Sequence, residues 1–325
     1  MIRTLLLCAW TLLSMGFSQA QAQGETFPNR PIRMIVPFPA GGPTDGMARI
    51  ISDRLGEVLG QAVVVENRGG GAGGSIGAKV VAAADSDGYT ILITPGGALT
   101  TGPAVHGNIG YDPVKAFVPV ACIMESPLVI AAHQDLPVKS LADVVAYAKA
   151  NPGKIIWGSQ GFGTAPHLLF ELFKLDTGVN VVQVPYRGTA PMLAAVVAGE
   201  VQMVADVMTT SLPHIESGKL RALAIAGAQR SAKLPDVPAT VEIGYPDLQS
   251  PFWLGVVAPA GTPPPVVDKL NAALRESLAP PRTRELLAKL GADIKIGTPA
   301  EFGKLLSDEL AKWTAVVKAA NIKVD

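Results

Sequence analysis

The sequence predicts an α/β protein of two lobes, and three observations support this fold class. Its 325 residues correspond to about two domains at roughly 150 residues each. Short β-branched runs are each followed by a glycine-rich turn and then by a helical pattern. The first three turns begin near residues 37, 67 and 94, and a spacing of about 30 residues is typical of βαβ units and therefore of a parallel sheet.

Residues 1–22 are predicted to be a secretory signal peptide. Arg3 precedes the apolar run LLLCAWTLL, and the small-residue site Ala20-Gln21-Ala22 follows it. The apolar run is shorter than the ~20 residues that a membrane span needs, so we expect cleavage and export to the periplasm. Removal of this segment would leave Cys122 as the only cysteine, and its apolar flanks predict a buried core thiol.

Three strand, turn and helix units make up the first hundred residues. The strands are expected at residues 32–36, 62–66 and 89–93. After the first strand, apolar residues recur on one helical face at Met47, Ile50, Ile51, Leu55, Val58 and Leu59. A second helix is expected from Ser75 to about Ala84.

A second series of elements starts after Cys122. Its strands are expected at residues 128–132, 154–158, 179–184, 201–205 and 220–227. Ser140 and Asp143 form a capping-box pattern that predicts the start of a helix. The segments SQGFGTAPHLLFELF and PYRGTAPMLAAVVAG predict a turn and a helix after the second and third of these strands.

The last third of the chain predicts one strand at residues 251–259 and helices that begin near Pro263 and Pro299. Thr298 and Glu301 form another capping box. Apolar residues recur at helical spacing after it, at Phe302, Leu306, Leu310, Trp313 and Val317. Such a stripe is typical of core packing.

We expect the second series to form a lobe that is inserted into the first. The predicted first lobe is discontinuous, at residues 23–122 and 228–325, and the predicted second lobe covers residues 123–227. No linker is apparent between the two series, so strands are expected to be shared between the lobes. The carboxyl ends of the strands would then face one cleft, which is where open α/β sheets bind ligands.

Glycine and proline are in excess, at 61 of 325 residues, about 19% where average usage gives about 12%. The surplus is concentrated in the loops that follow the predicted strands. Charge is balanced, with 27 basic and 27 acidic residues and no basic stripe. A nucleic-acid partner is therefore not expected.

Two enzyme motifs occur in the glycine-rich turn after residue 66. Gly69, Gly71 and Gly74 fit the dinucleotide-binding pattern, but the next strand ends in Thr94-Pro95 and lacks the acidic residue that would bind a ribose. The segment GGSIG places Ser75 in a nucleophile-elbow pattern. A secreted serine hydrolase using Ser75 therefore remains an alternative.

The histidines show no metal-binding motif. They are His106, His133, His167 and His214, and none has a second histidine or a cysteine at ligand spacing. We expect neither a metal nor a cofactor.

Four loops share one feature that favours an anion. Each leads into a helix N-terminus, where unpaired N–H groups and a partial positive charge attract negative groups. The loops are Pro37–Asp45, Thr94–Thr101, Ser159–His167 and Tyr186–Ala190. The last adds the guanidinium of Arg187, which is suited to bidentate recognition of a carboxylate.

Several segments of this chain resemble one receptor family over essentially the whole mature length. They are FPNRPIRMIVPFPAGGPTDG, WGSQGFGTAPHLLFELF, VPYRGTAPMLAAVVAGEVQMVAD and LPDVPATVEIGYPDLQSPFWLGVVAPAGTP. The chain is similar to the solute receptors of the tripartite tricarboxylate transporters, also called Bug receptors. This resemblance implies the α/β fold of a type II periplasmic binding protein, with a mainly parallel sheet in each lobe and a hinge of two strands.

The resemblance also implies binding residues. In the first lobe, the family's loop holds a carboxylate through backbone amides and water, which here gives Phe38, Pro39, Ala40, Gly41 and Gly42. Asp45 would orient this loop. In the second lobe, the matching residues are Ser159, Gly161, Gly163, Thr164, His167, Tyr186, Gly188 and Asp206. His167 lies in the first turn of a helix, so it either caps that helix or contacts the ligand.

Two departures from the family bear on specificity. Ala40 stands where a second proline is common, and the loop TPGGALTTG, with Thr94 and Gly96, is glycine-rich where many relatives are polar. Aromatic residues are expected to shape the pocket wall, at Phe38, Phe162, Tyr186 and Trp253.

The predicted function is that of a periplasmic receptor without catalytic groups. It would close its two lobes around a small carboxylate and deliver it, as a monomer, to a membrane permease of two subunits. A receptor that presents its ligand to a membrane sensor would share all of these features and remains a second alternative. The sequence leaves open whether the ligand is a dicarboxylate, an aromatic acid or an amino acid.

Overall fold

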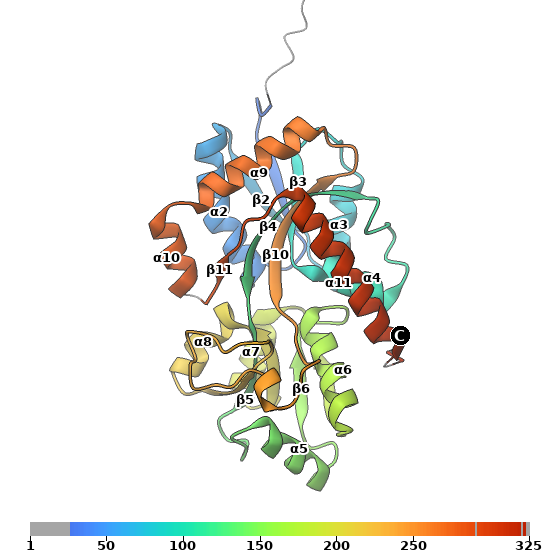
Figure 1. The fold of residues 1–325 in the computed structure, drawn as a ribbon, viewed down its shortest axis with the longest axis vertical. Coiled ribbons are helices and arrows are strands. Elements are labelled where there is room, and N and C mark those ends of the chain that lie inside the picture. The colour runs from blue at the N-terminus through green and yellow to red at the C-terminus, as the bar shows by residue number, and fades with distance from the viewer. Residues whose placement is uncertain (1–26, 290, 320, 323–325) are drawn as a thin grey trace, which may run out of the picture.

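Two lobes lie one above the other along the long axis of the molecule, and each is built around its own sheet (Figure 1). The computed structural model describes residues 27–289, 291–319 and 321–322. The predicted signal peptide, residues 1–22, lies outside these residues. No helix within the described part of the chain is long and apolar enough to cross a membrane.

The sheet of the first lobe has six strands in the order β11, β4, β10, β3, β1, β2. Their bounds are β1 Ile32–Val36, β2 Val63–Asn67, β3 Thr90–Thr94, β4 Phe117–Ser126, β10 Phe252–Pro259 and β11 Asp293–Ile294. Because successive side chains of a strand point to opposite faces, Met34 and Val36 of β1 pack in one apolar cluster and Ile35 in another.

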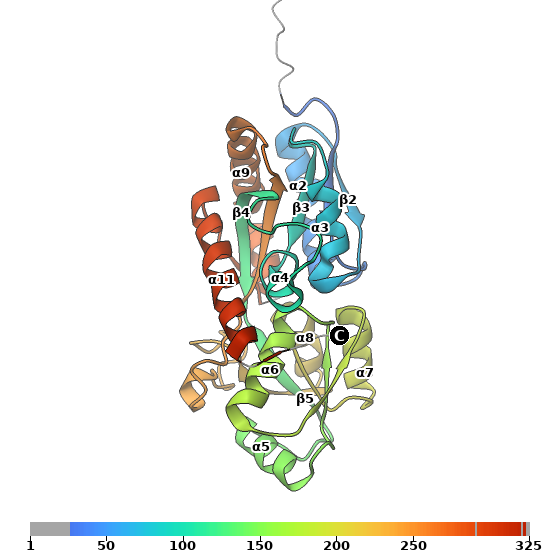
Figure 2. The ribbon, with the colours of Figure 1, turned by 90° about the vertical axis from the view of Figure 1, so that its right-hand side faces the viewer.

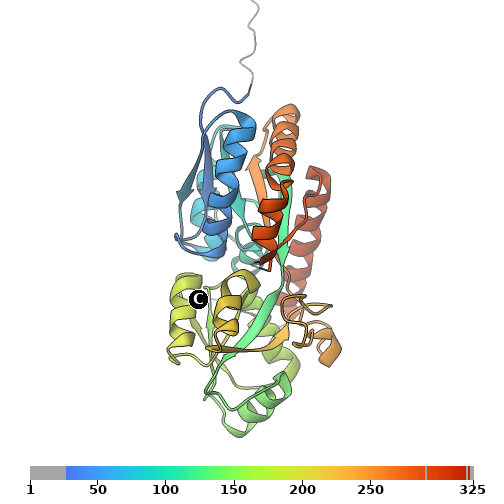
Figure 3. The same cartoon turned by 90° about the vertical axis from the view of Figure 1, so that its left-hand side faces the viewer.

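Helices cover both faces of this first sheet. They are α2 Pro43–Leu59, α3 Ser75–Ala82, α4 Thr101–His106, α9 Pro264–Leu278, α10 Pro281–Lys289 and α11 Pro299–Ala319. Helices α2 and α9 pack on one face, whereas α3, α4 and α11 lie on the other (Figures 2 and 3). Phe302 and Trp313 of the predicted apolar stripe on α11 are buried, which confirms that the stripe packs in the core.

The sheet of the second lobe has five strands in the order β7, β6, β8, β5, β9. Their bounds are β5 Leu128–His133, β6 Ile156–Ser159, β7 Val182–Pro185, β8 Met203–Val207 and β9 Leu220–Ile225. The helices of this lobe are α5 Leu141–Ala150, α6 Ala165–Thr177, α7 Thr189–Val197 and α8 Met208–Glu216. Ser140 accepts a hydrogen bond from the backbone N–H of Asp143 at 3.1 Å, which confirms the predicted start of α5.

Two segments cross between the lobes and change the character of both sheets. Strand β4 of the first lobe passes through Pro127 directly into β5 of the second, and β10 returns the chain to the first lobe. Both sheets are therefore mixed, which corrects the prediction that each is mainly parallel. The cause is that β10 runs antiparallel to β3 and β4, and β5 runs antiparallel to β8 and β9.

The loop before β10 is hydrogen-bonded to the end of β9 in the second lobe, whereas the sequence predicts residues from 228 onward in the first lobe. The backbone N–H of Thr240 donates to the carbonyl of Ile225 at 2.8 Å, and Ser250 donates to Ala226 at 3.2 Å. We therefore propose that the lobe boundary lies in the crossing segments, at Pro127 and near Pro251. Cys122 is 6% exposed within β4, as the prediction of a core thiol requires.

Candidate functional site

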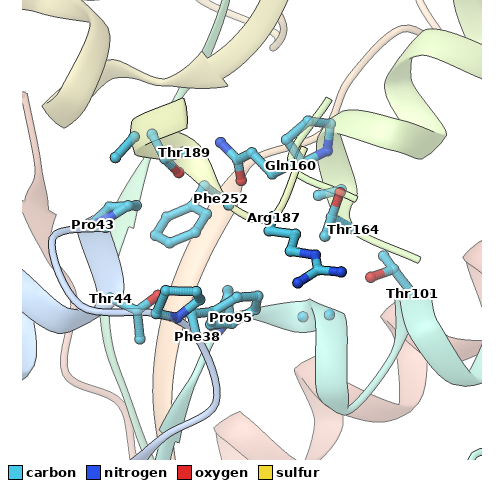
Figure 4. Close-up of a pocket in the computed structure, with 18 of the residues that line it drawn as sticks. Phe38, Pro43, Thr44, Pro95, Thr101, Gln160, Thr164, Arg187, Thr189 and Phe252 are labelled. Carbon is cyan, nitrogen blue, oxygen red and sulfur yellow. The ribbon is translucent and has the colours of Figure 1, made fainter. Parts of the chain in front are cut away.

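A cleft with two connected chambers lies between the lobes. The first chamber is lined by residues from both lobes, and Figure 4 shows ten of them with labels. Six residues line both chambers: Phe38, Pro39, Gln160, Thr164, Arg187 and Gly188. The centre of a water molecule can occupy about 60 Å³ of the first chamber and about 800 Å³ of the second. The first chamber is thus narrow, and the second chamber, which adjoins it, is wide.

Three α-helix N-termini meet at the first chamber. Helix α2 comes from the first lobe, and α6 and α7 come from the second. Their N-cap residues Gly42, Thr164 and Gly188 all line the chamber, and none of them makes a side-chain capping hydrogen bond. Because the first N–H groups of a helix have no acceptor within it, the chamber receives backbone donors and partial positive charge from both lobes.

Arg187 stands between the two chambers and lines both. No carboxylate of the described residues lies within ion-pairing distance of its guanidinium, unlike Arg33, which pairs with Glu66 at 2.7 Å. It is also the only lysine or arginine among the described residues that line the two chambers. An unpaired guanidinium beside helix N-termini is suited to a carboxylate.

The loop that precedes α2 is held in place by Asp45. This buried carboxylate accepts hydrogen bonds from the backbone N–H of Gly41 at 3.0 Å and from Asn67 at 3.0 Å. Arg49 also donates to it at 3.1 Å. Burial opposes ionisation, but these donors together hold the pKa of Asp45 below its usual value. Asp45 therefore supports the loop and does not line the chambers.

A second buried carboxylate, Asp206, supports the loop before α6. It lines neither chamber and is 0% exposed in β8. Burial raises the pKa of Asp206 to about 6, although hydrogen bonds from Thr210, Ser211, the Val207 backbone and Gln160 favour the ionised form. The side-chain amide of Gln160 donates to it at 2.5 Å. Asp206 thus reaches the cleft only through Gln160.

Hydrogen bonds join the two lobes at one corner of the cleft. The hydroxyl of Thr101 in α4 donates to the carbonyl of Gly163 at 2.7 Å, and the N–H of Gly73 donates to the carbonyl of Phe162 at 3.3 Å. A Cβ atom at Gly163 would lie 3.0 Å from the Cα of Gly102. Glycine at these positions therefore allows the backbones of the two lobes to approach one another.

Two histidines from different lobes lie beside this contact. His167 of α6 is 2% exposed and accepts a long hydrogen bond of 3.4 Å from the N–H of Gly163. Burial, with repulsion from Lys174 and from His106 when that ring is protonated, lowers the pKa of His167 to about 4. Burial also lowers the pKa of His106, whose Nε2 has no hydrogen-bond partner among the described residues. Both rings are neutral at pH 7, and His167 caps the loop instead of lining a chamber.

Comparison with known proteins gives the family. Residues 47–322 match the family described as the tripartite tricarboxylate transporter family receptor. The chain belongs to this receptor family. The receptor is 39% identical to the protein BugT of Bordetella pertussis over 306 residues, which cover 94% of each chain.

Solved structures share the fold of the receptor. The periplasmic binding protein BugD superimposes with a TM-score of 0.86 at 37% identity, covering 91% of the receptor and 99% of BugD. A Rhodopseudomonas palustris protein solved with adipate gives 0.87 at 37% identity, covering 91% and 99%. MatC of the same organism, solved with malate, gives 0.85 at 35% identity, covering 90% and 100%.

The cleft of the receptor brings together most of the residues that the sequence predicts for its site. Those that line a chamber are Phe38, Pro39, Ala40, Gly42, Gly96, Gly161, Thr164, Tyr186, Arg187 and Gly188. Those that line neither chamber are Gly41, Asp45, Thr94, Ser159, Gly163, His167 and Asp206. The predicted wall aromatics Phe162 and Trp253 also line the cleft.

Two of the predicted residues that line neither chamber lie directly beneath the loops of the cleft. Thr94 is fully buried and donates to the carbonyl of Pro95, the next residue, at 3.0 Å. Ser159 is also fully buried, and its hydroxyl has no hydrogen-bond partner among the described residues. Both residues are the last of their strands, so they lie just beneath the loops that reach the cleft.

Sequence reasoning missed several lining residues. Phe252 and Glu309 lie outside the predicted anion loops, whereas Thr101, Gln160 and Thr189 lie within those loops but were not predicted individually. Gln160 follows Ser159 within the predicted anion loop, so its polar side chain just after a strand was the available signal. Glu309 lies in α11 and gave no signal, because only the folded chain brings that helix to the chamber.

The alternative of a serine hydrolase finds no catalytic geometry in the described residues. Ser75 and His106 line one shallow surface groove, but no hydrogen bond joins them. The described residues also contain no group of three or more His, Cys, Asp or Glu side chains that could hold a metal ion. A nucleophilic serine needs a base within hydrogen-bonding reach, and no hydrogen bond from Ser75 to a base is found in the part of the chain that the structure describes.

Proposed function

We propose that this receptor is a periplasmic protein that captures a small carboxylate between its two lobes and delivers it to a two-subunit membrane permease. The observation that carries this proposal is the unpaired guanidinium of Arg187, which lies in one chamber with the N-termini of α2, α6 and α7. A carboxylate in that chamber would accept hydrogen bonds from both lobes at once.

Binding of this kind explains how a chain without a basic surface holds an anion. Hydrogen bonds to a charged group are each worth roughly 1.5 to 3 kcal/mol, and more when water is excluded. The chamber supplies them mainly from backbone, so it needs one arginine and no lysine. The relatives solved with adipate and malate support a carboxylate ligand.

The mechanism follows from the position of the ligand. In the open form, α2 would be separated from α6 and α7, and the ligand would reach one lobe through the wide second chamber. Closure brings the second set of donors onto the same carboxylate, so the ligand binds the closed form more tightly and shifts the population toward it. The permease would recognise the closed surface, and separation of the lobes would release the solute.

Calorimetric titration tests ligand capture. Wild-type receptor would be titrated with adipate, malate, succinate, benzoate and glutamate, and at least one should bind. Arg187→Ala should weaken that affinity about 10- to 100-fold, the equivalent of one charge-assisted pair. Arg282→Ala serves as the matched control, because Arg282 is exposed on α10 and lies outside both chambers. Equal affinities for wild type and Arg187→Ala would contradict the proposal.

Delivery needs a separate experiment. Immobilised receptor, loaded with its carboxylate, should retain two integral membrane subunits from detergent-solubilised membranes of the source organism, and retain less of them without ligand. Retention of a sensor protein instead of a permease would favour the alternative role in signalling.

A further inference from the structure

Gln160 is a neutral polar side chain of the cleft whose amide has a defined orientation. It lies just after β6 and lines both chambers, next to Arg187 and Thr164. One N–H of its amide nitrogen donates to Oδ1 of Asp206 at 2.5 Å. Its amide oxygen has no hydrogen-bond partner among the described residues. Figure 4 shows this oxygen on the side toward Phe252 and Arg187, with the nitrogen on the far side.

Asp206 fixes this orientation. Its other oxygen, Oδ2, accepts hydrogen bonds from the hydroxyls of Thr210 and Ser211, both at 2.7 Å. An ionised carboxylate can only accept, so the side chain that faces it must present a donor. If the amide of Gln160 were turned over, its oxygen would face the oxygen of a fully buried carboxylate, and two acceptors would be left without a donor between them. The bond to Asp206 therefore fixes the amide of Gln160 with its oxygen turned toward the cleft.

We propose that Asp206 is a positioning residue that holds Gln160 with its oxygen toward the ligand, and that the receptor consequently selects carboxylates that carry a hydroxyl or ammonium group. The carboxylate would bind at Arg187 and the helix N-termini, and the donor group on the neighbouring carbon atoms would bind Gln160. This inference rests on the proposed function, because it concerns a second contact of the same ligand.

The preference should be modest and measurable. A ligand without the donor leaves the oxygen of Gln160 unpaired, and one such hydrogen bond corresponds to about 3- to 10-fold in affinity. The probes are three matched pairs that differ by a single hydroxyl: malate and succinate, 2-hydroxyglutarate and glutarate, mandelate and phenylacetate. Wild type should bind the hydroxylated member of at least one pair more tightly by that factor.

Two variants separate positioning from packing. Gln160→Met keeps the side-chain length but removes the acceptor, so both members of a pair should bind with affinities within about twofold. Asp206→Asn can donate to the oxygen of Gln160 and so turn its amide over, which should abolish or invert the preference. Gln229→Met is the control, because Gln229 is exposed in the loop after β9 and lies outside the cleft.

The possible outcomes separate a failure of this inference from a failure of the proposed function. If no carboxylate binds to wild type, the proposed function fails and the inference fails with it. If carboxylates bind but hydroxylated members are not preferred, the inference alone is wrong. If the preference exists and persists in both Gln160→Met and Asp206→Asn, then neither residue causes it. Should Asp206→Asn not fold, the result for Gln160→Met still decides the role of the amide oxygen.

Discussion

The hydroxyl of Thr101 donates a 2.7 Å hydrogen bond to the carbonyl of Gly163 across the boundary between the lobes. Thr101 begins α4 of the first lobe, and Gly163 lies in the loop before α6 of the second. Both partners are buried. The bond therefore joins the two lobes directly, and in the proposed mechanism of closure it would be lost when they separate.

Thr101→Val should shift the receptor toward the open form. Valine has nearly the same shape but cannot donate, so the carbonyl of Gly163 would be left unpaired on closure, at a cost of about 1 to 3 kcal/mol. The radius of gyration of the ligand-free protein should rise in small-angle X-ray scattering, and carboxylate affinity should fall about 5- to 100-fold. Thr314→Val in α11 is the control, because its hydroxyl bonds only within that helix. Unchanged affinity would mean that this bond does not contribute to closure.

Arg187→Lys should give an affinity between those of wild type and Arg187→Ala. Lysine keeps the charge but lacks the planar fork that can donate two parallel hydrogen bonds to a carboxylate. We expect a loss of about threefold to tenfold in calorimetric titration, smaller than the loss for Arg187→Ala. An affinity equal to that of wild type would indicate that charge alone matters at this position.

Gly163→Ala should impair binding more than it impairs folding. Gly163 has a φ of +74°, and a Cβ there would meet Gly102 of the opposite lobe at 3.0 Å and the ring of His106 at 3.3 Å. Gly178 provides a matched control at the other end of α6, because its φ is +66° but no atom lies within 4 Å of an added Cβ.

Both alanine variants should lose about 1 kcal/mol of unfolding free energy from left-handed strain. Only Gly163→Ala should also lose carboxylate affinity. Equal affinities in the two variants would show that closure does not require the close approach at Gly163.

His167 should make the receptor less stable at low pH. Its pKa is about 4 in the folded protein and about 6.5 when unfolded, so the unfolded state binds more protons between these values. The contribution of neutral His167 to the free energy of unfolding is therefore complete above pH 6.5 and is lost as the pH falls toward 4. The difference in unfolding free energy between wild type and His167→Asn should decrease by about 3 kcal/mol over this range in urea titrations.

Asp206 acts in the opposite direction, because its folded pKa is raised to about 6. Its buried charge destabilises the fold above that pH, and this cost is relieved as the pH falls from about 6 to 4. The contribution of Asp206 cancels in the difference in unfolding free energy between wild type and His167→Asn, because both proteins contain Asp206. A pH-independent difference would contradict a buried neutral His167.

Patterns among residues that are close in sequence correctly predicted several elements of this fold. The βαβ spacing, the capping box at Ser140 and the stripe on α11 all depend on residues close in sequence, and each is confirmed. Strand β4 was missed, and the direction of β10 depends on where the chain re-enters the first lobe. Helix α10 was also missed, because Leu287 is its only buried residue and leaves no clear periodic pattern.

The candidate site also contains some features that are visible in the local sequence and others that depend on contacts between distant residues. Glycine loops after strands were visible in the sequence, and they do converge on the cleft. The role of Asp206 was not visible, because it depends on a hydrogen bond to Gln160, 46 residues away in the chain. The contact of Thr101 with Gly163 joins residues 62 positions apart and appears only when the two lobes meet.

The most direct test of the account is a crystal structure of the receptor with its tightest-binding carboxylate. We predict that one carboxylate group lies in the first chamber, hydrogen-bonded to Arg187 and to first-turn N–H groups of α2 in one lobe and of α6 or α7 in the other. A carboxylate bound elsewhere, or bound by one lobe only in the closed protein, would contradict the account.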